Sequence, residues 1–447
     1  MARMFGTDGV RGVANVELTS ELAFKLGQAG ARVLAKTSSG TPTVLIGKDT
    51  RISGDMLESA LAAGICSVGA NAVFAGVIPT PAIAYLTRKY KADAGVVISA
   101  SHNPAKYNGI KFFSGTGFKL PDEVEDEIEA LIEAGVTDLP GGDAVGRITY
   151  ATEAVDDYAD FAASTIDCTL DGIKIAVDCA NGASYKVAPM VLQRLGADVT
   201  VIENNPDGVN INAKCGSTYL DNIGEYVRGG NYDIGVAFDG DADRVLLVDA
   251  QGNEIDGDKI MAALSLQLKE EGKLKNNTLV ATVMSNMGLF IMAEKHGINV
   301  LKTKVGDRYV LEEMMAGGHI IGGEQSGHII LCDFNTTGDG LVSALQFLRT
   351  MKKTGKTAAQ LASVMEKLPQ VLINVKVDNS KKAELDGDTV IADRIKQTED
   401  LLAGTGRVLI RPSGTEPKIR VMLEGSDEAL IQKEAEAIAA LINERLG

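Results

Sequence analysis

The chain has 447 residues, which is too long for one hydrophobic core and predicts three or four domains. Its 45% apolar and 23% charged residues are typical of a folded globular protein and exclude a disordered or fibrous chain. The net charge of −16, from 44 basic and 60 acidic residues, argues against a nucleic-acid partner but leaves room for a small phosphorylated ligand.

The cysteines and the N-terminus indicate the cellular compartment. Five cysteines are scattered without a CxxC pair, which predicts reduced thiols rather than a disulfide framework. The first residues lack the apolar stretch of a signal peptide, and no run reaches the ~18 apolar residues of a membrane span. We therefore expect a cytoplasmic protein with no membrane partner.

Three stretches of the chain share one design, in which a short apolar strand ends in polar or glycine residues and leads into a helical pattern. Their strands begin near residues 44, 173 and 279. This alternation predicts three successive α/β domains with mixed, parallel-rich sheets and helices on the sheet faces. In such sheets, functional groups gather at the carboxyl ends of the strands.

The C-terminal part has a different pattern and predicts a smaller α+β domain. Three strands, over residues 372–377, 408–411 and 419–423, precede a helix over residues 427–446. Apolar residues recur along this helix at spacings of 4, 3 and 4, as one buried face requires (Ile431, Ala435, Ile438 and Ile442). The expected domains are residues 1–152, 153–252, 253–367 and 368–447.

An acidic segment between two apolar runs is the strongest candidate site. It reads Asp239-Gly240-Asp241-Ala242-Asp243-Arg244. Carboxylates at alternate positions can converge on one hard cation such as Mg2+. A calcium EF-hand loop would need glycine and glutamate where Arg244 and Ala250 stand, so that alternative fails. A plain acidic turn is the other alternative, but it does not explain an arginine directly after three aspartates.

A second segment follows an apolar strand over residues 94–98 and reads Ser99-Ala100-Ser101-His102-Asn103-Pro104. A serine at a strand end can act as a nucleophile or carry a phosphate. Phosphoserine adds a charge of about −1.5 to −2 and needs cations nearby, for which Arg11, Lys106 and Lys111 are candidates. The alternative is an ordinary turn closed by Asn103 and Pro104.

Two further loops carry polar groups around glycines. Residues 322–328 present Glu324, Ser326 and His328 at alternate positions, which suits a polyhydroxylated ligand. Residues 411–417, with Arg420 beyond them, combine two arginines, hydroxyl groups and free backbone N–H groups, which together can form a phosphate cradle. An ordinary glycine or proline turn is the alternative for each loop.

Together and in this order, the four segments resemble the signature loops of the α-D-phosphohexomutase superfamily, over the whole chain. Residues 5–12 and 324–326 resemble its bacterial branch that acts on glucosamine phosphate. The resemblance implies a four-domain, heart-shaped fold around a central cleft. It implies a phosphoserine at Ser101 and sugar contacts at Glu324 and Ser326. It also implies metal ligands and a distal phosphate site: Ser101, Asp239, Asp241 and Asp243 for the metal, and Arg411, Ser413, Gly414, Thr415 and Arg420 for the phosphate.

The implied activity is an intramolecular phosphotransfer that interconverts glucosamine 6-phosphate and glucosamine 1-phosphate, a step toward UDP-N-acetylglucosamine and cell-wall precursors. The phosphate of Ser101 passes to the sugar, and a 1,6-bisphosphate turns over and returns its other phosphate. The expected cofactors are one Mg2+ per chain and glucosamine 1,6-bisphosphate as intermediate and activator. The candidates for charge balance, proton handling and substrate contact are Arg11, His102, Lys111, Arg308 and His328.

Other functions stay open at this point. A phosphoglucomutase or phosphomannomutase of the same superfamily would use the same loops. A metal-dependent sugar phosphatase would use the aspartates but would gain nothing from a second phosphate cradle far downstream. A non-catalytic phosphosugar sensor would not need an intact serine and metal loop. The expected partner is a small hexosamine phosphate, and a homodimer is one possible assembly.

Overall fold

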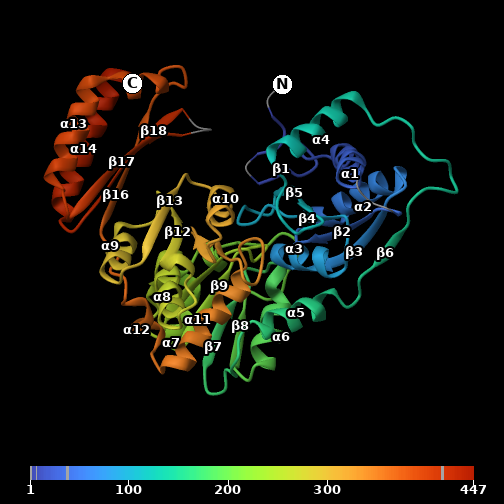
Figure 1. Cartoon of the computed structure of the whole chain (residues 1–447), viewed down its shortest axis with the longest axis horizontal. Helices are drawn as coiled ribbons and strands as arrows, with labels where there is room; N and C mark the ends of the chain where they lie inside the picture. The colour runs from blue at the N-terminus through green and yellow to red at the C-terminus, as the bar shows by residue number, and fades with distance from the viewer. Residues whose placement is uncertain (1–2, 7, 37–39, 414–416) are drawn as a thin grey trace. The chain divides into compact units, whose positions relative to one another are not determined.

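The computed structural model describes residues 3–6, 8–36, 40–413 and 417–447, with the side chain of Asp386 excepted (Figure 1). It divides into two compact units. The first comprises Met1–Met284 and Ile298–Val364 and holds three sheets, and the second comprises Ser285–Gly297 and Met365–Gly447 and holds a fourth. Within the described ranges, no helix combines the length and apolar character needed to cross a membrane.

The first sheet is mixed, with the strand order β1-β5-β4-β2-β3-β6. Strand β5 is antiparallel to both of its neighbours, and the other pairs are parallel. Its strands are β1 (Val10–Val13), β2 (Thr43–Lys48), β3 (Asn71–Val77), β4 (Ala94–Ile98), β5 (Tyr107–Ser114) and β6 (Ile148–Tyr150).

Helices cover both faces of this sheet because successive residues of a strand point in opposite directions. Val44 and Ile46 of β2 join the core formed with α1 (Ser20–Leu34), α2 (Ser53–Ser67) and α4 (Asp122–Ala134). Gly47 of the same strand faces Ile83 of α3 (Thr80–Lys89), which lies against the opposite face.

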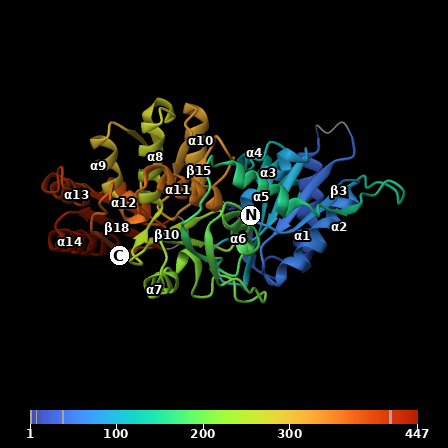
Figure 2. The same ribbon diagram turned by 90° about the horizontal axis from the view of Figure 1, so that it is seen from below.

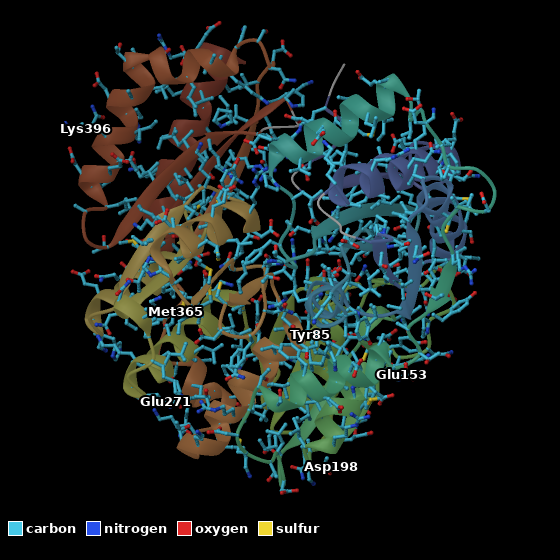
Figure 3. The ribbon with its side chains drawn as sticks, turned by 45° about the vertical axis from the view of Figure 1, so that its right-hand side comes forward. Tyr85, Glu153, Asp198, Glu271, Met365 and Lys396 are labelled. Carbon is cyan, nitrogen blue, oxygen red and sulfur yellow. The ribbon has the colours of Figure 1, made fainter. Side chains whose placement is uncertain are left out.

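The second sheet has the order β11-β10-β9-β7-β8, with parallel pairs around β7 and antiparallel pairs around β10. Tyr85 of α3, which is labelled in Figure 3, stacks on Phe161 of helix α5 (Ala154–Ser164) with ring centroids 3.9 Å apart, and this contact connects the first two α/β layers. The elements are β7 (Lys174–Asp178), β8 (Asp198–Ile202), β9 (Ile234–Phe238), β10 (Val245–Asp249), β11 (Glu254–Ile255), α5 (Ala154–Ser164), α6 (Val187–Arg194) and α7 (Asp221–Gly229).

The third sheet has the order β13-β12-β14-β15, in which only β15 is antiparallel. Helix α8 packs against α11, and the two lie side by side in both ribbon views (Figures 1 and 2). The elements are β12 (Thr278–Thr282), β13 (Asn299–Thr303), β14 (Ile321–Gly323), β15 (Ile329–Leu331), α8 (Gly257–Glu270), α10 (Asp307–Gly317), α11 (Gly340–Thr354) and α12 (Ala358–Ala362).

The second unit is an antiparallel sheet packed against helices. Its strands, in the order β16-β18-β17, are β16 (Gln370–Lys376), β18 (Lys418–Gly425) and β17 (Gly406–Pro412). The four apolar residues expected on one face of the last helix, α14 (Glu428–Leu446), are all fully buried. The unit also contains α9 (Met287–Lys295) and α13 (Thr389–Leu401).

The predicted fold class is confirmed: the first unit holds parallel-rich α/β sheets, and the C-terminal sheet is smaller and antiparallel. The expected strand starts near residues 44, 173 and 279 correspond to β2, β7 and β12. Helix α13 was not predicted from the sequence. The four domain bounds stay a prediction.

Candidate active site

Three of the predicted loops follow the carboxyl ends of three strands in the first unit. Residues 99–104, called the serine loop below, follow β4. Residues 239–244, the aspartate loop, follow β9, and Glu324 follows β14. Each strand is fully buried, so its backbone is fixed and the polar residues at its end inherit a fixed position.

The aspartate loop brings three buried carboxylates together. Asp239, Asp241 and Asp243 each offer an oxygen within 4.8 Å of the others, and each is at most 4% exposed. Oδ2 of Asp241 accepts from Thr80 Oγ1 at 2.6 Å and from Lys111 Nζ at 2.9 Å. Ala242 adopts the left-handed backbone conformation with φ 56°, which turns the loop between the second and third carboxylates.

The unpaired oxygens of this cluster fit a bound cation. Oδ1 of Asp241 and Oδ1 of Asp243 are buried and accept no hydrogen bond from the described residues. A buried carboxylate oxygen without a partner is costly, because it has lost water and gained nothing. All of the available donors are carboxylate oxygens, which hard divalent cations prefer. The triad can therefore hold a metal ion.

The carboxylates perturb one another's protonation. Burial raises the pKa of Asp239 well above its usual value, and the charges of Asp243 and Asp241 raise it further. Burial also acts to raise the pKa of Asp243, but His328 and Lys111 outweigh it and hold that pKa below its usual range. Mutual repulsion of this kind is relieved by a cation between the carboxylates.

Ser101 lies directly against this cluster. Its Oγ donates to Asp239 Oδ2 at 2.6 Å and is 3.3 Å from Nδ1 of His102. Burial, followed by the charges of Arg244 and Arg11, lowers the pKa of His102 to about 4. The Nε–H groups of Arg11 and Arg244 are buried without an acceptor among the described residues. Both arginines lower the pKa of His102, which lies next to Ser101. An anion bound beside Ser101 would accept hydrogen bonds from their Nε–H groups.

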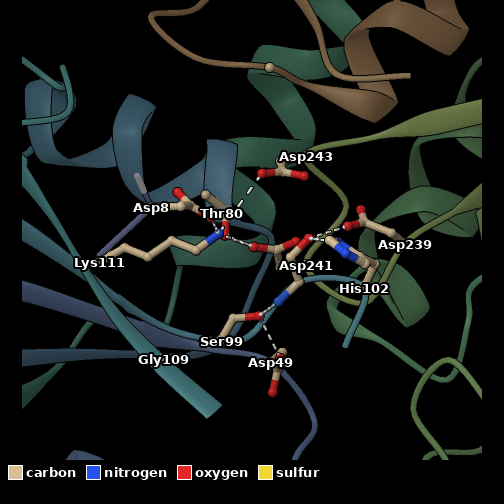
Figure 4. A network of polar contacts seen from close by, with 12 residues as sticks. Asp8, Asp49, Thr80, Ser99, His102, Gly109, Lys111, Asp239, Asp241 and Asp243 are labelled. Carbon is tan, nitrogen blue, oxygen red and sulfur yellow. Dashed lines mark hydrogen bonds and ion pairs between the residues drawn. The ribbon is translucent and has the colours of Figure 1, made fainter. Parts of the chain in front are cut away.

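Lys111 connects the aspartate loop to a second group of buried charges (Figure 4). Its Nζ lies 2.9 Å from Asp241, 2.9 Å from Asp8 and 3.9 Å from Asp243. Asp8 also pairs with Arg11 and, at 2.7 Å, with Lys119. Asp8 therefore forms ion pairs with two of the predicted cations, Arg11 and Lys111, and orients both side chains.

The same chain of charges closes on itself through α10. Lys119 pairs with Asp307, the first residue of that helix. Oδ2 of Asp307 is 3.5 Å from Nε2 of His328, and Nδ1 of His328 is 3.5 Å from Asp243. We call the six residues the charge ring: Asp243, Lys111, Asp8, Lys119, Asp307 and His328.

The remaining residues predicted for the first unit have other surroundings. Glu324 Oε1 accepts from the N–H of Gly306 at 3.1 Å, and Ser326 is exposed. Arg308 is paired through Nη1 with Asp122 at 2.5 Å and through Nε with Glu312 at 2.8 Å. The structure thus brings Ser101, His102, Lys111 and His328 to the three aspartates, whereas Arg308 is paired with other carboxylates.

In the second unit, Arg411 of β17 and Arg420 of β18 are cross-strand partners. Burial, followed by the charge of Arg420, lowers the pKa of Arg411. Two cations held side by side in this way favour a bound anion. The carbonyl of Ser413 accepts from Lys382 Nζ at 2.5 Å. Gly414 and Thr415, which were also predicted here, lie outside the described residues.

Comparison with known proteins gives the family. Models of the phosphoglucomutase/phosphomannomutase α/β/α domains I, II and III and of the C-terminal domain match residues 2–138, 156–252, 256–368 and 372–441. A phosphoglucosamine mutase of Ruminiclostridium cellulolyticum is 60% identical, and one of Acetivibrio thermocellus is 57% identical; both alignments cover 100% of each chain. The chain belongs to the phosphoglucomutase/phosphomannomutase family.

Solved structures agree on the fold. A phosphoglucomutase/phosphomannomutase family protein from Burkholderia thailandensis has a TM-score of 0.84 at 21% identity, over 100% of this chain and 98% of its own. Aspergillus fumigatus N-acetylphosphoglucosamine mutase, solved with GlcNAc-6P and magnesium, has a TM-score of 0.71 at 18% identity, over 99% of this chain and 95% of its own. The superfamily predicted from the four loops is confirmed.

Sequence reasoning missed several polar residues around the site of this phosphohexomutase. Thr80, Lys119 and Asp307 contact the predicted residues but stand in no motif of their own. Asp8 stood within the recognised N-terminal segment and was not given a role. A carboxylate three residues before Arg11 in the same segment was the available signal. Arg51, three residues beyond the end of β2, was also missed.

Proposed function

We propose that this phosphohexomutase interconverts glucosamine 6-phosphate and glucosamine 1-phosphate through a phosphoserine at Ser101. The observation that carries the proposal is the 2.6 Å contact between Ser101 Oγ and Asp239, beside two buried carboxylate oxygens that accept no hydrogen bond from the described residues. The glucosamine specificity is supported by the full-length relatives named phosphoglucosamine mutase.

In the first half-reaction, the C1 hydroxyl of glucosamine 6-phosphate attacks the phosphorus of the Ser101 phosphate. The new bond joins O1 to phosphorus, the bond from phosphorus to Oγ breaks, and its electron pair stays on Oγ. The C1 hydroxyl loses a proton and Oγ gains one. His102, 3.3 Å from Oγ, and Lys111, held against Asp241, are the candidates nearest to these events.

In the second half-reaction, glucosamine 1,6-bisphosphate turns over, so that its C6 phosphate faces Ser101. Oγ loses its proton and attacks that phosphorus, the bond from phosphorus to the C6 oxygen breaks, that oxygen takes a proton, and glucosamine 1-phosphate is released. The phosphoserine is thereby restored. A bisphosphate lost before this return must be replaced, which makes glucosamine 1,6-bisphosphate an activator as well as an intermediate.

Phosphoryl transfer depends mainly on positioning and on charge stabilisation. We assign Mg2+ to Asp239, Asp241, Asp243 and an oxygen on Ser101, where it would neutralise charge on the transferring group. Arg11 and Arg244, whose Nε–H groups find no hydrogen-bond acceptor in the described part of the chain, would bind the same phosphate. His328 is oriented by Asp243 beside Nδ1 and by the N–H of Gly338, which donates to Nε2 at 3.1 Å, and it is the remaining candidate for proton handling.

The non-transferring phosphate needs a binding site of its own. We assign it to Arg411, Ser413 and Arg420 in the second unit, together with Gly414 and Thr415. Glu324 and Ser326 are assigned to the sugar hydroxyls, and Glu324 to the charged 2-amino group as well. Arg308 would have to leave Asp122 or Glu312 to contact substrate, so we rank it below the other arginines.

A substrate panel tests this proposal. We expect kcat/KM for glucosamine 1-phosphate to exceed that for glucose and mannose 1-phosphates by at least 10-fold, because a site with buried polar partners rejects analogues that lack them. Glu324→Gln should lower kcat/KM for glucosamine 1-phosphate more than it lowers kcat/KM for glucose 1-phosphate. Equal or faster turnover of glucose 1-phosphate would contradict the glucosamine assignment. Release of inorganic phosphate in excess of isomerisation would indicate a phosphatase instead.

A further inference from the structure

The backbone of Ser101 is held in a conformation that serine seldom adopts. Its φ is 50°, in the left-handed region, and the residue is 1% exposed. Such a conformation costs of order 1–3 kcal/mol and persists only when the surrounding structure enforces it. Strained residues of this kind concentrate at functional sites. The groups that enforce the strain at Ser101 are therefore of interest.

Arg51 makes most of the contacts that enforce this conformation. Asn212 Nδ2 adds hydrogen bonds to the carbonyls of Ser101 at 2.9 Å and Asn103 at 3.2 Å. The Arg51 side chain is completely buried, and its Nη1 donates to the carbonyls of Pro104 at 2.6 Å and Tyr107 at 3.0 Å. Nη2 donates to the carbonyls of Ser101 at 2.9 Å and Asn103 at 2.7 Å. An arginine has five N–H donors in a rigid planar arrangement, and these contacts use four of them on the backbone of and just after the serine loop.

The fifth donor anchors Arg51 to Asp49. Nε donates to Asp49 Oδ2 at 2.8 Å, and the Arg51 backbone N–H donates to Oδ1 at 2.9 Å. Ser99 donates its hydroxyl to the same carboxylate at 2.6 Å and accepts the N–H of Ser101 at 2.9 Å. The N–H and the carbonyl of Ser101 are thus both connected to one buried ion pair.

This arrangement leaves Arg51 nothing with which to bind substrate. All five of its donors are used within the protein, and its charge is balanced by Asp49. Its effect on the reaction must therefore be geometric. Because it holds backbone carbonyls, its contacts do not depend on whether the Ser101 hydroxyl carries a phosphate.

We propose that Arg51 is a positioning residue for the phosphoserine reaction, which fixes Ser101 in the left-handed conformation so that Oγ faces Asp239 in both half-reactions. This inference rests on the proposed function, in which one oxygen is first a leaving group and then a nucleophile at the same place. A lysine cannot replace Arg51, since three donors on a flexible stem cannot hold four carbonyls and a carboxylate.

Arg51→Lys is the direct test, and Arg349→Lys is its matched control. Arg349 is also a buried arginine, 8% exposed, but it pairs with Asp167 and Glu271 outside the site. We expect Arg51→Lys to lower kcat by ~100-fold, the loss that a displacement of about 1 Å can cause, with KM changed by less than ~3-fold. Arg51→Lys and Arg349→Lys should lower the thermal midpoint by similar amounts. Arg349→Lys should nevertheless leave kcat within ~2-fold of wild type.

A second variant and a second readout keep the test independent of folding and of the sugar. Ser99→Ala removes a single hydroxyl from the same network and should lower kcat by ~10-fold in a folded protein. Phosphorylation of Ser101 after incubation with glucose 1,6-bisphosphate, followed by mass spectrometry, should be slowed in Arg51→Lys and Ser99→Ala but not in Arg349→Lys.

The outcomes separate the two proposals. If wild type acquires phosphate on Ser101 but does not isomerise glucosamine phosphates, the proposed function fails and the role of Arg51 is still measured. If folded Arg51→Lys, or Ser99→Ala where the lysine variant does not fold, acquires phosphate and turns over like Arg349→Lys, the positioning role is wrong.

Discussion

Thr80 binds both the side chain and the backbone of Asp241. Its hydroxyl donates to Oδ2 at 2.6 Å, and its N–H donates to the carbonyl at 2.9 Å. Thr80 is the first residue of α3, so the aspartate loop is held at a helix N-terminus, where negative charge is favoured. With Oδ2 used by Thr80 and Lys111, Oδ1 is left to face a cation.

We therefore expect Thr80→Val to weaken metal binding. The substitution keeps the shape of the side chain but removes the donor that orients Asp241. Loss of an outer-sphere partner of this kind costs ~10–100-fold in metal affinity. A Mg2+ titration of mutase activity should show the half-saturating concentration rising by that factor. Thr80→Ser, which keeps the hydroxyl, should stay near wild type, and an unchanged titration curve for Thr80→Val would contradict the assignment.

Asp241→Ala should abolish turnover and leave the fold intact. The buried carboxylates repel one another, so removal of one relieves repulsion, and Lys111 keeps Asp8 at 2.9 Å and Asp243 at 3.9 Å as partners. We expect a thermal midpoint within a few degrees of wild type, no calorimetric Mg2+ binding, and loss of wild-type activity in EDTA that Mg2+ restores. Full activity of the variant, or of wild type in EDTA, would rule out the metal site.

The Lys119–Asp307 pair in the charge ring predicts strong coupling between two substitutions. Both side chains are mostly buried, at 16% and 17% exposed. Among the charged partners that the structure describes, removing Asp307 leaves Lys119 with Asp8 alone, and removing Lys119 leaves Asp307 with only His328 at 3.5 Å. Breaking a buried pair costs ~3–5 kcal/mol, whereas replacing both partners by apolar residues can be nearly neutral. The double variant Lys119→Met/Asp307→Leu should therefore unfold at a higher temperature than either single variant.

The surface pair Lys36–Glu127 supplies the control for this cycle. These side chains are 57% and 47% exposed, and exposed pairs contribute ~0–1 kcal/mol. Lys36→Met and Glu127→Leu should shift the midpoint little, singly or together. Additive losses at Lys119 and Asp307 would show that the two residues are not coupled.

The sequence predicted what local patterns encode. Apolar runs that end in polar loops located β4, β9 and β14, and the spacing of Asp239, Asp241 and Asp243 predicted converging carboxylates. The buried face of α14 followed from its apolar spacing. Helix α13 was missed because only two of its residues, Ile391 and Thr398, are buried, and one of these is polar, so the sequence shows no clear apolar stripe.

The partners of the site residues could not be predicted in the same way. Thr80 and Asp241 are 161 residues apart, and Lys119 and Asp307 are 188 apart. Such contacts exist only after separate sheets have packed, and no local spacing encodes them. Nor does an arginine in a sequence indicate whether it binds substrate, as Arg308 was expected to do, or pairs with Asp122 and Glu312.

Asp178 gives the second sheet a pH-dependent stability. Burial raises the pKa of Asp178 to about 6, despite hydrogen bonds from the N–H groups of Gly216 and Ala180. The unfolded value is ~3.9, so the folded state binds more protons between these limits. The stability that this proton uptake contributes is full below pH ~4 and is lost as the pH rises through 6.

Asp178→Asn should remove this dependence. The thermal midpoint of wild type relative to Asp178→Asn should fall between pH 4.5 and pH 7, by the equivalent of up to ~3 kcal/mol for two pKa units. Asp143→Asn, at an exposed position, controls for the loss of a charge and should show no such trend. A difference between wild type and Asp178→Asn that does not change with pH would show that Asp178 is ionised throughout this range.

The last prediction concerns the covalent step at Ser101. If the enzyme donates a phosphate that it already carries, a fraction of the active protein should be ~80 Da heavier than its sequence mass. The added mass should map to Ser101 and not to Ser99, because Ser99 Oγ is used by Asp49 and by the N–H of Ser101, whereas Ser101 Oγ faces Asp239. Activity should rise with the phosphorylated fraction.

Ser101→Ala removes the atom that holds the phosphate between half-reactions. A loss of several orders of magnitude in kcat is expected, on the scale seen when a nucleophile is deleted. Labelled phosphate should pass from substrate to wild type and to Ser99→Ala, but not to Ser101→Ala. Sugar 1,6-bisphosphate should reactivate dephosphorylated wild type and leave Ser101→Ala inactive, since only the wild type has an oxygen to accept the phosphoryl group. Near-normal mutase activity of Ser101→Ala would show that the phosphate does not pass through this serine.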